Sequence, residues 1–355
     1  MGTELAASAP ASLRTAVHEK IPRDWYVPDR RIYWTDLVAS AAIGWAALAG
    51  AALSDAMLVQ AGLALVATFA LYRATSFIHE LTHVNRRELP WFDVAWHAVA
   101  GIPLLVPLFL YEGVHLDHHR PRLYGTDGDP EYLPFAHQPA WMIGLFAASA
   151  TLLPIAMVLR FAVLAPISWL VPPLRRRLLA RASSLAINPR YVRQRRLAAA
   201  GLVQEAMCAV VCWTAVTAWA TGVLPGRLIV AWTVVAAAAA AINAVRVLAA
   251  HRYESDGHEM TTLGQLLDSR TIIAEPARGM RAVWELLFAP VGLRYHALHH
   301  WIPALPYHSL GRTHRLVVGL AAAGTYCQTM STLQEAVVAL LRRQEENRSA
   351  GLERG

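Results

Sequence analysis

The chain has 355 residues, of which 55% are hydrophobic and 16% are charged. Because soluble domains carry about 25% charged residues, this composition excludes an ordinary soluble enzyme and predicts an integral membrane protein. The formal net charge of +7 does not require a nucleic-acid partner, since arginines beside membrane spans are expected from the positive-inside rule.

A polar segment precedes the first apolar stretch and covers residues 1–34. It contains Lys20, Arg23, Arg30 and Arg31 and has no early apolar core, so it lacks the pattern of a cleavable signal peptide. We expect the chain to be inserted by its own membrane spans and this N-terminal segment to lie in the cytosol.

Four apolar stretches are long enough to cross the hydrocarbon core as helices, which takes about 20 residues at a rise of about 1.5 Å each. They run from about 35 to 53, 55 to 78, 198 to 222 and 227 to 250. Two further apolar stretches, 93–112 and 138–173, are interrupted by prolines and charged residues, and we interpret them as interfacial or re-entrant segments. The four spans should form two helical hairpins, with turns at Ser54 and Asp55 and in TGVLPGR.

A basic connection precedes the third span. It holds eight arginines: Arg175, Arg176, Arg177, Arg181, Arg190, Arg193, Arg195 and Arg196. Beside membrane spans such a cluster indicates the cytoplasmic side. We therefore expect a protein of a bacterial-type inner membrane with this connection in the cytoplasm.

Eight histidines fall into three short groups, HELTH, HLDHH and HALHH. They are His79 and His83, then His115, His118 and His119, then His296, His299 and His300. Positions i, i+3 and i+4 share one face of a helix, so each group points its imidazoles at one place. Imidazole suits iron, copper and zinc, and this many desolvated imidazoles without partners would be costly, so we predict metal binding. Eight imidazoles exceed the ligand set of a single zinc, which implies two metal ions.

HELTH also matches the HExxH motif of zinc metalloproteases, in which His79 and His83 would hold zinc and Glu80 would activate water. The chain lacks the glycine and histidine of the extended form of this motif. Asp256 is the only candidate for a later aspartate ligand, and its surroundings are polar. A membrane zinc protease and a non-catalytic membrane scaffold remain alternatives.

The order HxxxH, HxxHH and HxxHH, placed after the second span, shortly afterwards and near the C-terminal end, resembles the membrane fatty acid desaturase superfamily. The resemblance runs from about Asp24 to about Arg315, and the stretches HLDHHRPRLYGTDGDPEYLP and PVGLRYHALHHWIPALPYHSLGRTHR are similar to bacterial acyl desaturase homologues. It implies an all-α integral membrane protein, a four-transmembrane-helix bundle with a cytosolic helical cap that carries a His-rich di-iron site. Residues 35–315 would form this domain and residues 316–355 a C-terminal helical tail.

The resemblance also implies a ninth histidine ligand at the end of the fourth span, where the chain has His251. In stearoyl-type desaturases an asparagine one turn before that histidine contacts iron through water, whereas this chain has Val247 there. Asn243, two turns before His251, is the candidate substitute. All nine ligands must lie on one side of the membrane, which requires that 138–173 does not cross it once.

Metal-bound imidazoles usually donate their second N–H to a carboxylate or a carbonyl group. The acidic candidates for this role are Glu80, Asp117, Asp127, Asp129, Glu131, Glu254, Asp256 and Asp268. We favour Glu80 and Asp268 because the residues around them are apolar, and we leave His308 and His314 out of the ligand set. We interpret four aromatic residues as an interfacial belt: Trp91, Trp96, Tyr111 and Trp141.

The resemblance implies oxidation of a fatty acyl chain at two iron ions, with O2 as cosubstrate. We favour desaturation to a cis alkene, and we keep hydroxylation and decarboxylation to a terminal alkene as alternatives within the superfamily. The substrate is expected to be a fatty acid, an acyl thioester or a membrane lipid, oxidised at the cytosolic face.

Electrons must reach the metal centre from outside the chain. The sequence has no cytochrome b5 segment of the HPGG type and no GxGxxG fingerprint, and Cys208, Cys212 and Cys327 are too scattered for an iron–sulfur cluster. We therefore expect an external donor, a ferredoxin-like or other redox carrier, attracted by the arginines of 175–196.

Overall fold

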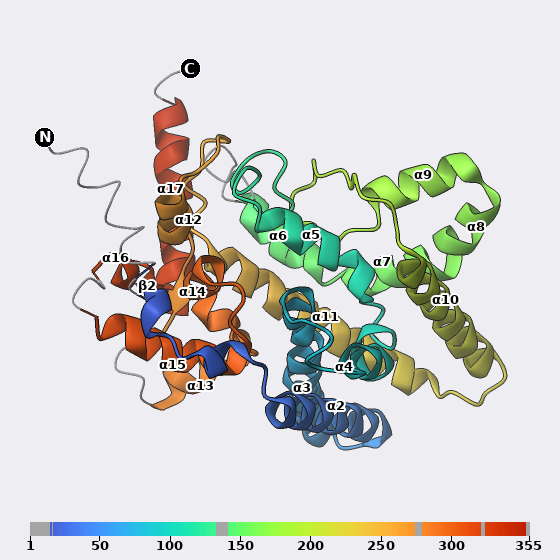
Figure 1. Ribbon diagram of the computed structural model, residues 1–355. Coiled ribbons are helices and arrows are strands. Elements are labelled where there is room, and N and C mark those ends of the chain that lie inside the picture. Colours follow the sequence, from blue (N-terminus) through green and yellow to red (C-terminus); the bar gives the residue numbers. More distant parts are fainter. Residues whose placement is uncertain (1–14, 16, 133–140, 274–278, 321–323, 353–355) are drawn as a thin grey trace, which may run out of the picture.

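The computed structural model describes residue 15 and residues 17–132, 141–273, 279–320 and 324–352, and these are mostly helical (Figure 1). The longest helices are α2 (Arg30–Leu53), α3 (Met57–His83), α10 (Ala199–Ala220) and α11 (Gly226–Ala250). They coincide with the four predicted spans, and both predicted hairpin turns are present. Helix α3 continues five residues beyond the predicted end, so that HELTH forms its last turn.

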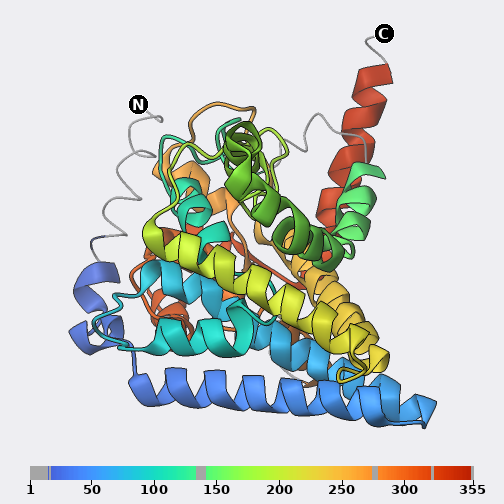
Figure 2. The same ribbon diagram turned by 90° about the vertical axis from the view of Figure 1, so that its right-hand side faces the viewer.

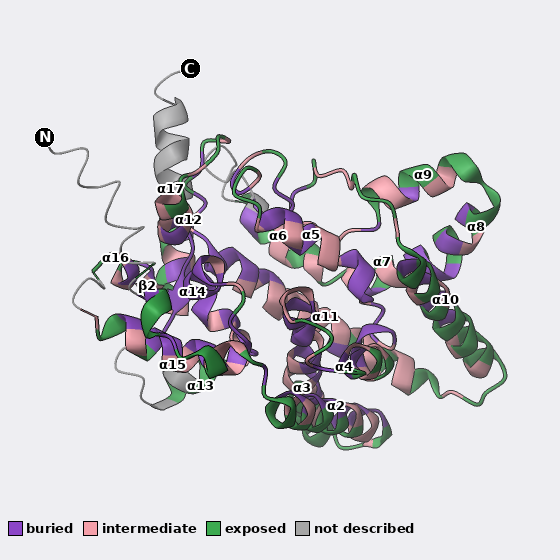
Figure 3. Ribbon diagram, viewed as in Figure 1, coloured by how far each residue is buried: buried purple, intermediate pink, exposed green. Residues whose placement is uncertain are grey.

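Helices α2, α3 and α11 pack against one another, while α10 packs mainly against the helical segment 160–170. Figure 2 shows α10, in yellow-green, in front of the other long helices. Figure 3 shows exposed residues along α2 and α10, and mostly buried residues at the end of α11. The exposed faces carry large apolar side chains, among them Val38, Leu58, Val210 and Trp213. Contiguous exposed apolar surface of this kind suits lipid rather than water.

Residues 141–173, the described part of the predicted interfacial or re-entrant stretch 138–173, are mostly helical. After α6 (Trp141–Ala150) the chain turns and continues as α7 (Leu153–Leu159), a π-helical turn at Arg160–Leu164 and α8 (Ala165–Leu170). The prolines do not interrupt the helix. Pro154 lies in its first turn, where no backbone N–H is needed, and Pro166 comes just after the π-helical turn, where the hydrogen-bond pattern changes. Leu153–Leu170 is therefore a fifth helical stretch, among the described residues, that is long and apolar enough to cross a membrane.

A buried ion cluster holds this helical stretch against α10. Glu205 of α10 accepts from Arg160 at 2.5 Å and from Arg175 at 2.6 Å, and it is fully buried. Arg175 belongs to α9 (Pro172–Arg181), which follows α8. Each charge therefore has a partner in an apolar setting, where an unpaired charge would be expensive.

The stretch 93–112 folds back into the protein as short turns. These are α4 (Phe92–Trp96), a π-helical turn at His97–Gly101, a 3-10 turn at Leu108–Leu110 and α5 (Glu112–His118). The prediction of an interfacial Trp96 is wrong, because its ring is fully buried and its indole N–H donates to the Ala74 carbonyl at 2.9 Å. Trp91 and Trp141, in contrast, are exposed.

The C-terminal third forms a layer of short elements over one end of the long helices. It comprises α12 (Thr262–Asp268), β1 (Thr271–Ile272), α13 (Gly279–Phe288), a 3-10 turn (Leu293–Tyr295), α14 (His296–Trp301), α15 (Tyr307–Val318), α16 (Gly324–Cys327), β2 (Met330–Ser331) and α17 (Leu333–Leu352). Strands β1 and β2 pair in parallel, with Thr271 opposite Met330. The core of this layer includes Leu298, Trp301 and Tyr326, and the N-terminal Val17 also packs there.

Candidate metal centre

Four helix ends bring all nine predicted histidines to one place. His79 and His83 lie in the last turn of α3, three histidines lie at the end of α5, His251 follows α11, and three lie on α14. Gly292 has a φ of +71°, and a Cβ atom there would lie 2.9 Å from Cβ of Tyr307. This glycine therefore permits the close turn that directs the chain into α14.

The histidines form two groups rather than the three seen in the sequence. The first group contains His79, His83, His115, His119 and His299, and the second contains His118, His251, His296 and His300. Within each group the ligand atoms lie within 4.8 Å of one another. The division follows helix geometry, because residues four apart, such as His115 and His119, share a group, while the intervening His118 faces the other one.

The spacing of the imidazole nitrogens fits metal ions at both groups. In the first group, Nε2 of His119 lies 3.0 Å from that of His115 and 3.1 Å from that of His299. In the second, Nε2 of His296 lies 2.9 Å from that of His251 and 3.1 Å from that of His300. For bonds of about 2.1 Å, two nitrogens on one ion are about 3.0 Å apart at a right angle and about 3.4 Å apart in a tetrahedron. The observed distances are close to the spacing of nitrogens that share one ion.

Unpartnered polar atoms give a second test of this fit. Nε2 of His79 and of His83 are buried and have no hydrogen-bond partner among the described residues. Leaving such an atom unpaired costs about 1–3 kcal/mol. A metal ion at the first group would use both nitrogens as ligands and remove this cost.

Burial also keeps most of these imidazoles in the form that binds metal. It holds the pKa of five of them well below the usual value: His115, His119, His296, His299 and His300. Neutral imidazole is the metal-ligating form. Burial alone would also lower the pKa of His118, but the adjoining Asp129 carboxylate outweighs it and raises this pKa.

Two carboxylates behind α5 orient histidines of the HLDHH motif, one from each metal group. Nδ1 of His118 lies 2.8 Å from Oδ1 of Asp129, and Nδ1 of His115 lies 2.8 Å from Oε1 of Glu131. Both contacts leave Nε2 directed at the metal groups, as carboxylates behind metal-bound imidazoles do. Burial raises the pKa of Glu131 to about 7, although the charges of His118 and Arg246 oppose this.

A tyrosine connects the ninth histidine to Asp268. The Tyr124 hydroxyl lies 2.9 Å from Nδ1 of His251 and donates to Asp268 at 2.8 Å. Asp268 also accepts from the Tyr132 hydroxyl at 3.0 Å and from the backbone N–H of Glu254 at 2.8 Å. Asp268 thus lies behind the His251 imidazole, as expected for a carboxylate that supports a metal ligand. The hydrogen bonds between Asp268 and this imidazole pass through the Tyr124 hydroxyl.

The other favoured partners lie at different distances from the metal groups. Glu80 accepts from the Tyr33 hydroxyl and from the Tyr307 backbone N–H, and its second oxygen is 3.6 Å from Nδ1 of His79. Asn243 is not part of either group; its amide oxygen accepts from Arg246 at 2.7 Å. Its contact with iron through water stays a prediction.

The remaining candidates lie away from both groups. Asp117 pairs with Arg120 and Arg195, and Asp127 pairs with Arg190 at the surface. Asp256 and Glu254 are exposed. His308 accepts from the backbone N–H of Asp29, and His314 contacts the Tyr326 hydroxyl, so both lie outside the groups as expected.

Sequence reasoning missed the tyrosines that support the centre. Tyr111, which was assigned to the interfacial belt, places its hydroxyl 2.9 Å from Nδ1 of His115, one helical turn away. That spacing of four residues is a signal which could have identified it. Tyr124 and Tyr132 lie in a connection, and no local pattern relates them to His251, which follows more than 100 positions later.

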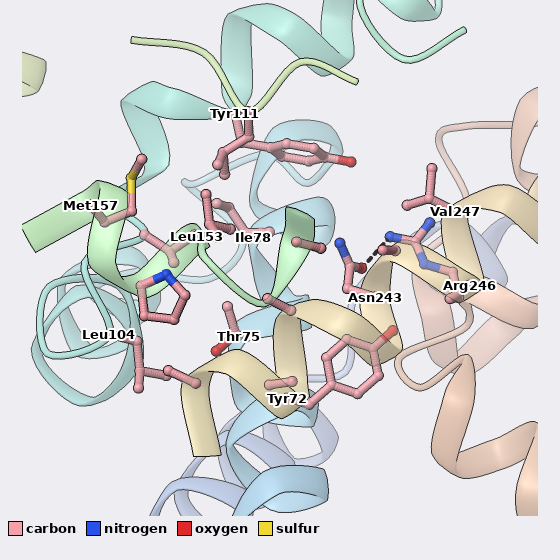
Figure 4. Close-up of a pocket in the computed structure, with 18 of the residues that line it drawn as sticks. Tyr72, Thr75, Ile78, Leu104, Tyr111, Leu153, Met157, Asn243, Arg246 and Val247 are labelled. Carbon is pink, nitrogen blue, oxygen red and sulfur yellow. Dashed lines mark hydrogen bonds between the residues drawn. The ribbon is translucent and has the colours of Figure 1, made fainter. Parts of the chain in front are cut away.

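A cavity of about 420 Å³ opens beside the first histidine group (Figure 4). Its wall is mainly apolar and comes from α3, α6, α7 and α11, with His79, Tyr111 and Glu131 at the metal centre. Leu104, Leu153 and Met157 line its other parts (Figure 4). The cavity therefore joins an apolar space to the imidazoles.

Comparisons with known proteins agree with these observations. The family model described as fatty acid desaturase matches residues 55–331. A ceramide hydroxylase from Caulobacter vibrioides (strain NA1000 / CB15N) is 41% identical over 309 residues, which are 86% of this chain and 86% of that protein. No solved structure matches the chain. The chain therefore belongs to the fatty acid desaturase family and is a membrane oxidoreductase.

Proposed function

We propose that the enzyme hydroxylates the acyl chain of a membrane lipid, using O2 and two iron ions. The observation that carries this proposal is the meeting of nine imidazoles in two groups beside an apolar cavity. Desaturation was favoured from the sequence, but the relative that covers 86% of the chain is a ceramide hydroxylase, which moves hydroxylation to first place.

Iron is proposed as the metal because an unactivated C–H bond needs an oxidant that side chains cannot provide. Two iron ions, one at each histidine group, would supply O2 activation and oxidation of the C–H bond. A zinc protease is not supported, because a catalytic zinc takes three protein ligands and a water, far fewer than the nine imidazoles here.

The residues around the imidazoles would keep the ligands in place. Asp129 and Glu131 hold the rings of His118 and His115, and Tyr124 holds that of His251. The apolar walls of the cavity would exclude bulk water and keep an acyl chain next to His79. Hydroxylation inserts one oxygen atom of O2 into a C–H bond, and two electrons and two protons convert the other into water.

We also propose that four helices cross the membrane and that the centre faces the cytoplasm. His118 and His251 belong to one group, so the chain between them must cross an even number of times. Helices α10 and α11 provide two crossings. Leu153–Leu170 would therefore enter the membrane and return to the same side without crossing it. The exposed Arg176, Arg177 and Arg181 then lie on the same side as the centre, in agreement with the positive-inside rule.

The electron donor is proposed to be an acidic carrier such as a ferredoxin. Several arginines of 175–196 are used internally, because Arg175 pairs with Glu205 and Arg195 pairs with Asp117. The exposed arginines of α9 remain a positive surface for docking.

Desaturation is the second candidate, supported by the description of the matching family. It would use the same centre and remove a second hydrogen from the adjacent carbon. Decarboxylation to a terminal alkene is a further outcome of the same chemistry, without an observation that favours it.

Product analysis with labelled oxygen tests the proposal. The purified protein in lipid nanodiscs would be given iron, a reduced ferredoxin, ¹⁸O2 and a ceramide, and the lipid analysed by mass spectrometry. Hydroxylation predicts one ¹⁸O atom in the acyl chain, whereas desaturation predicts the loss of two hydrogens and no label. His118→Ala should abolish product, and His258→Ala, at an exposed histidine outside both groups, should not. Loss of hydrogen without label would replace hydroxylation by desaturation.

A further inference from the structure

An arginine lies in the apolar wall of the cavity without a carboxylate partner. Arg246 belongs to α11 and lines the cavity (Figure 4). Two other arginines of the apolar helices are neutralised, since Arg73 pairs with Asp36 at 2.6 Å and Arg160 with Glu205 at 2.5 Å. No carboxylate of the described residues lies within ion-pair distance of Arg246, although Glu131 lines the same cavity, where burial raises its pKa and the charge of Arg246 acts to lower it. An intramembrane cation of this kind indicates a functional site.

The guanidinium of Arg246 is only partly hydrogen-bonded. One of its nitrogens donates to the amide oxygen of Asn243 at 2.7 Å, and its Nε is buried without a partner among the described residues. Figure 4 shows the two side chains directed at each other at one end of the cavity. Because Arg246 occupies the amide oxygen, the NH2 group of Asn243 is the part left to contact a ligand.

This polar corner lies close to the metal centre. Arg246 precedes His251 by five residues, which is about 7.5 Å along the helix axis at about 1.5 Å per residue. The same cavity is lined by His79 and Glu131. A group held by Arg246 would thus lie near the imidazoles, with the apolar part of the cavity available for a hydrocarbon chain.

The hydrogen-bonding groups of Arg246 and Asn243 determine which ligand can bind between them. A guanidinium donates hydrogen bonds and accepts none, and the free NH2 group of Asn243 also donates. The ligand must therefore present an oxygen acceptor while the rest of it is apolar. An acyl lipid meets this requirement at its carbonyl, whether the carbonyl belongs to an amide, an ester, a thioester or a carboxylate.

We propose that Arg246 and Asn243 bind the carbonyl oxygen of the acyl substrate and direct oxidation to carbons close to that carbonyl. This inference rests on the proposed acyl oxidation and adds the position of attack. With the carbonyl anchored beside the metal groups, the first carbons of the chain lie at the centre and the remainder fills the apolar cavity. It assigns Asn243 to the substrate instead of to iron.

The test measures KM, kcat, hydroxyl position and iron content in Arg246→Gln and Asn243→Leu. A hydrogen bond to a charged group predicts a rise in KM of about 10- to 100-fold for Arg246→Gln, with iron content unchanged. The hydroxyl should also spread to carbons further from the carbonyl. Arg227→Gln at the other end of α11, where the arginine pairs with the exposed Asp55, is the matched control and should leave all four quantities unchanged.

A substrate analogue provides a readout that a structural role would not affect. An ether-linked lipid of equal chain length lacks the carbonyl, so the wild-type enzyme should use it about 10- to 100-fold less well than the acyl lipid. Arg246→Gln should show little further loss with the ether, because the contact is already missing. Parallel assays with a ceramide, an acyl thioester and a free fatty acid identify which carbonyl is used.

Several results would overturn the inference. An unchanged KM and hydroxyl position in both variants, equal use of the ether and acyl lipids, or loss of iron from Asn243→Leu would each contradict carbonyl binding. Wild-type hydroxylation in the middle of the chain would also contradict it while leaving the proposed function intact. A wild-type enzyme that yields no oxidised lipid would instead refute the proposed function.

Discussion

Replacing Asp129 by Asn removes a charge behind the metal centre with little change of shape. Asp129 is fully buried and lies 2.8 Å and 3.0 Å, through its two oxygens, from Nδ1 of His118. It also accepts from the backbone N–H groups of Gly125 and Glu131, each at 2.9 Å. The amide NH2 of asparagine cannot accept, so at least one of these buried donors loses its partner.

The expected effect has two parts. An unsatisfied buried donor costs about 1–3 kcal/mol of folding free energy. Loss of a carboxylate that orients a metal ligand typically lowers metal affinity or activity about 10- to 100-fold. We expect Asp129→Asn to fold, to lose metal preferentially from the group of His118, and to be about 10- to 100-fold less active.

Metal retention under a graded chelator challenge, followed by metal analysis and turnover, measures both parts. Asp127→Asn is the matched control two residues away, because its carboxylate is exposed and, among the described residues, forms an ion pair only with Arg190, at 3.4 Å. The control should retain its metal as the wild-type protein does. Equal metal retention and turnover in Asp129→Asn would refute the role given to this carboxylate.

Three further predictions concern stability and the cavity. Glu205→Gln leaves the buried Arg160 and the partly buried Arg175 without a counter-charge and should lower the free energy of unfolding by about 3–5 kcal/mol. Asp55→Asn, which breaks the exposed pair with Arg227, should lower it by less than about 1 kcal/mol, and equal unfolding temperatures of the two variants would contradict this. Gly44→Ala places a Cβ atom 2.6 Å from the Leu71 side chain and should destabilise the α2–α3 hairpin by about 1–3 kcal/mol. Gly62→Ala, whose Cβ atom meets no neighbouring atom within 4 Å, should not destabilise it. Equal stability of the two variants would contradict close packing of α2 against α3 at Gly44. Ala240→Phe narrows the cavity and should reduce turnover of long acyl chains more than of short ones in competition assays. An unchanged preference for chain length would show that the acyl chain binds outside this cavity.

Much of the fold follows from local patterns in the sequence. Long apolar runs identify α2, α3, α10 and α11, because only a helix satisfies its backbone hydrogen bonds within lipid. Histidines at spacings of three and four are sufficient to identify three of the segments that meet at the candidate metal centre. His251 has no such pattern around it, and its place was inferred from the resemblance alone.

The features that the sequence did not predict depend on tertiary contacts. Asp129 and Glu131 were named among the eight acidic candidates but not favoured, because their contacts with His118 and His115 depend on how the connection after α5 folds back. Trp96 resembles an interfacial residue by composition, but its chain segment folds inward and buries it. The continuous helix over Leu153–Leu170 was hidden by two prolines, of which Pro154 lies in its first turn and Pro166 just after a π-helical turn.

The metal content of the purified protein tests the central claim most directly. Elemental analysis of iron, zinc and copper, expressed per chain and combined with Mössbauer spectroscopy, distinguishes a coupled pair of irons from a single ion. The nine imidazoles in two groups predict two irons per wild-type chain and a clear loss in His299→Ala or His300→Ala. One zinc per chain, or iron that is unaffected by both replacements, would contradict the proposed centre.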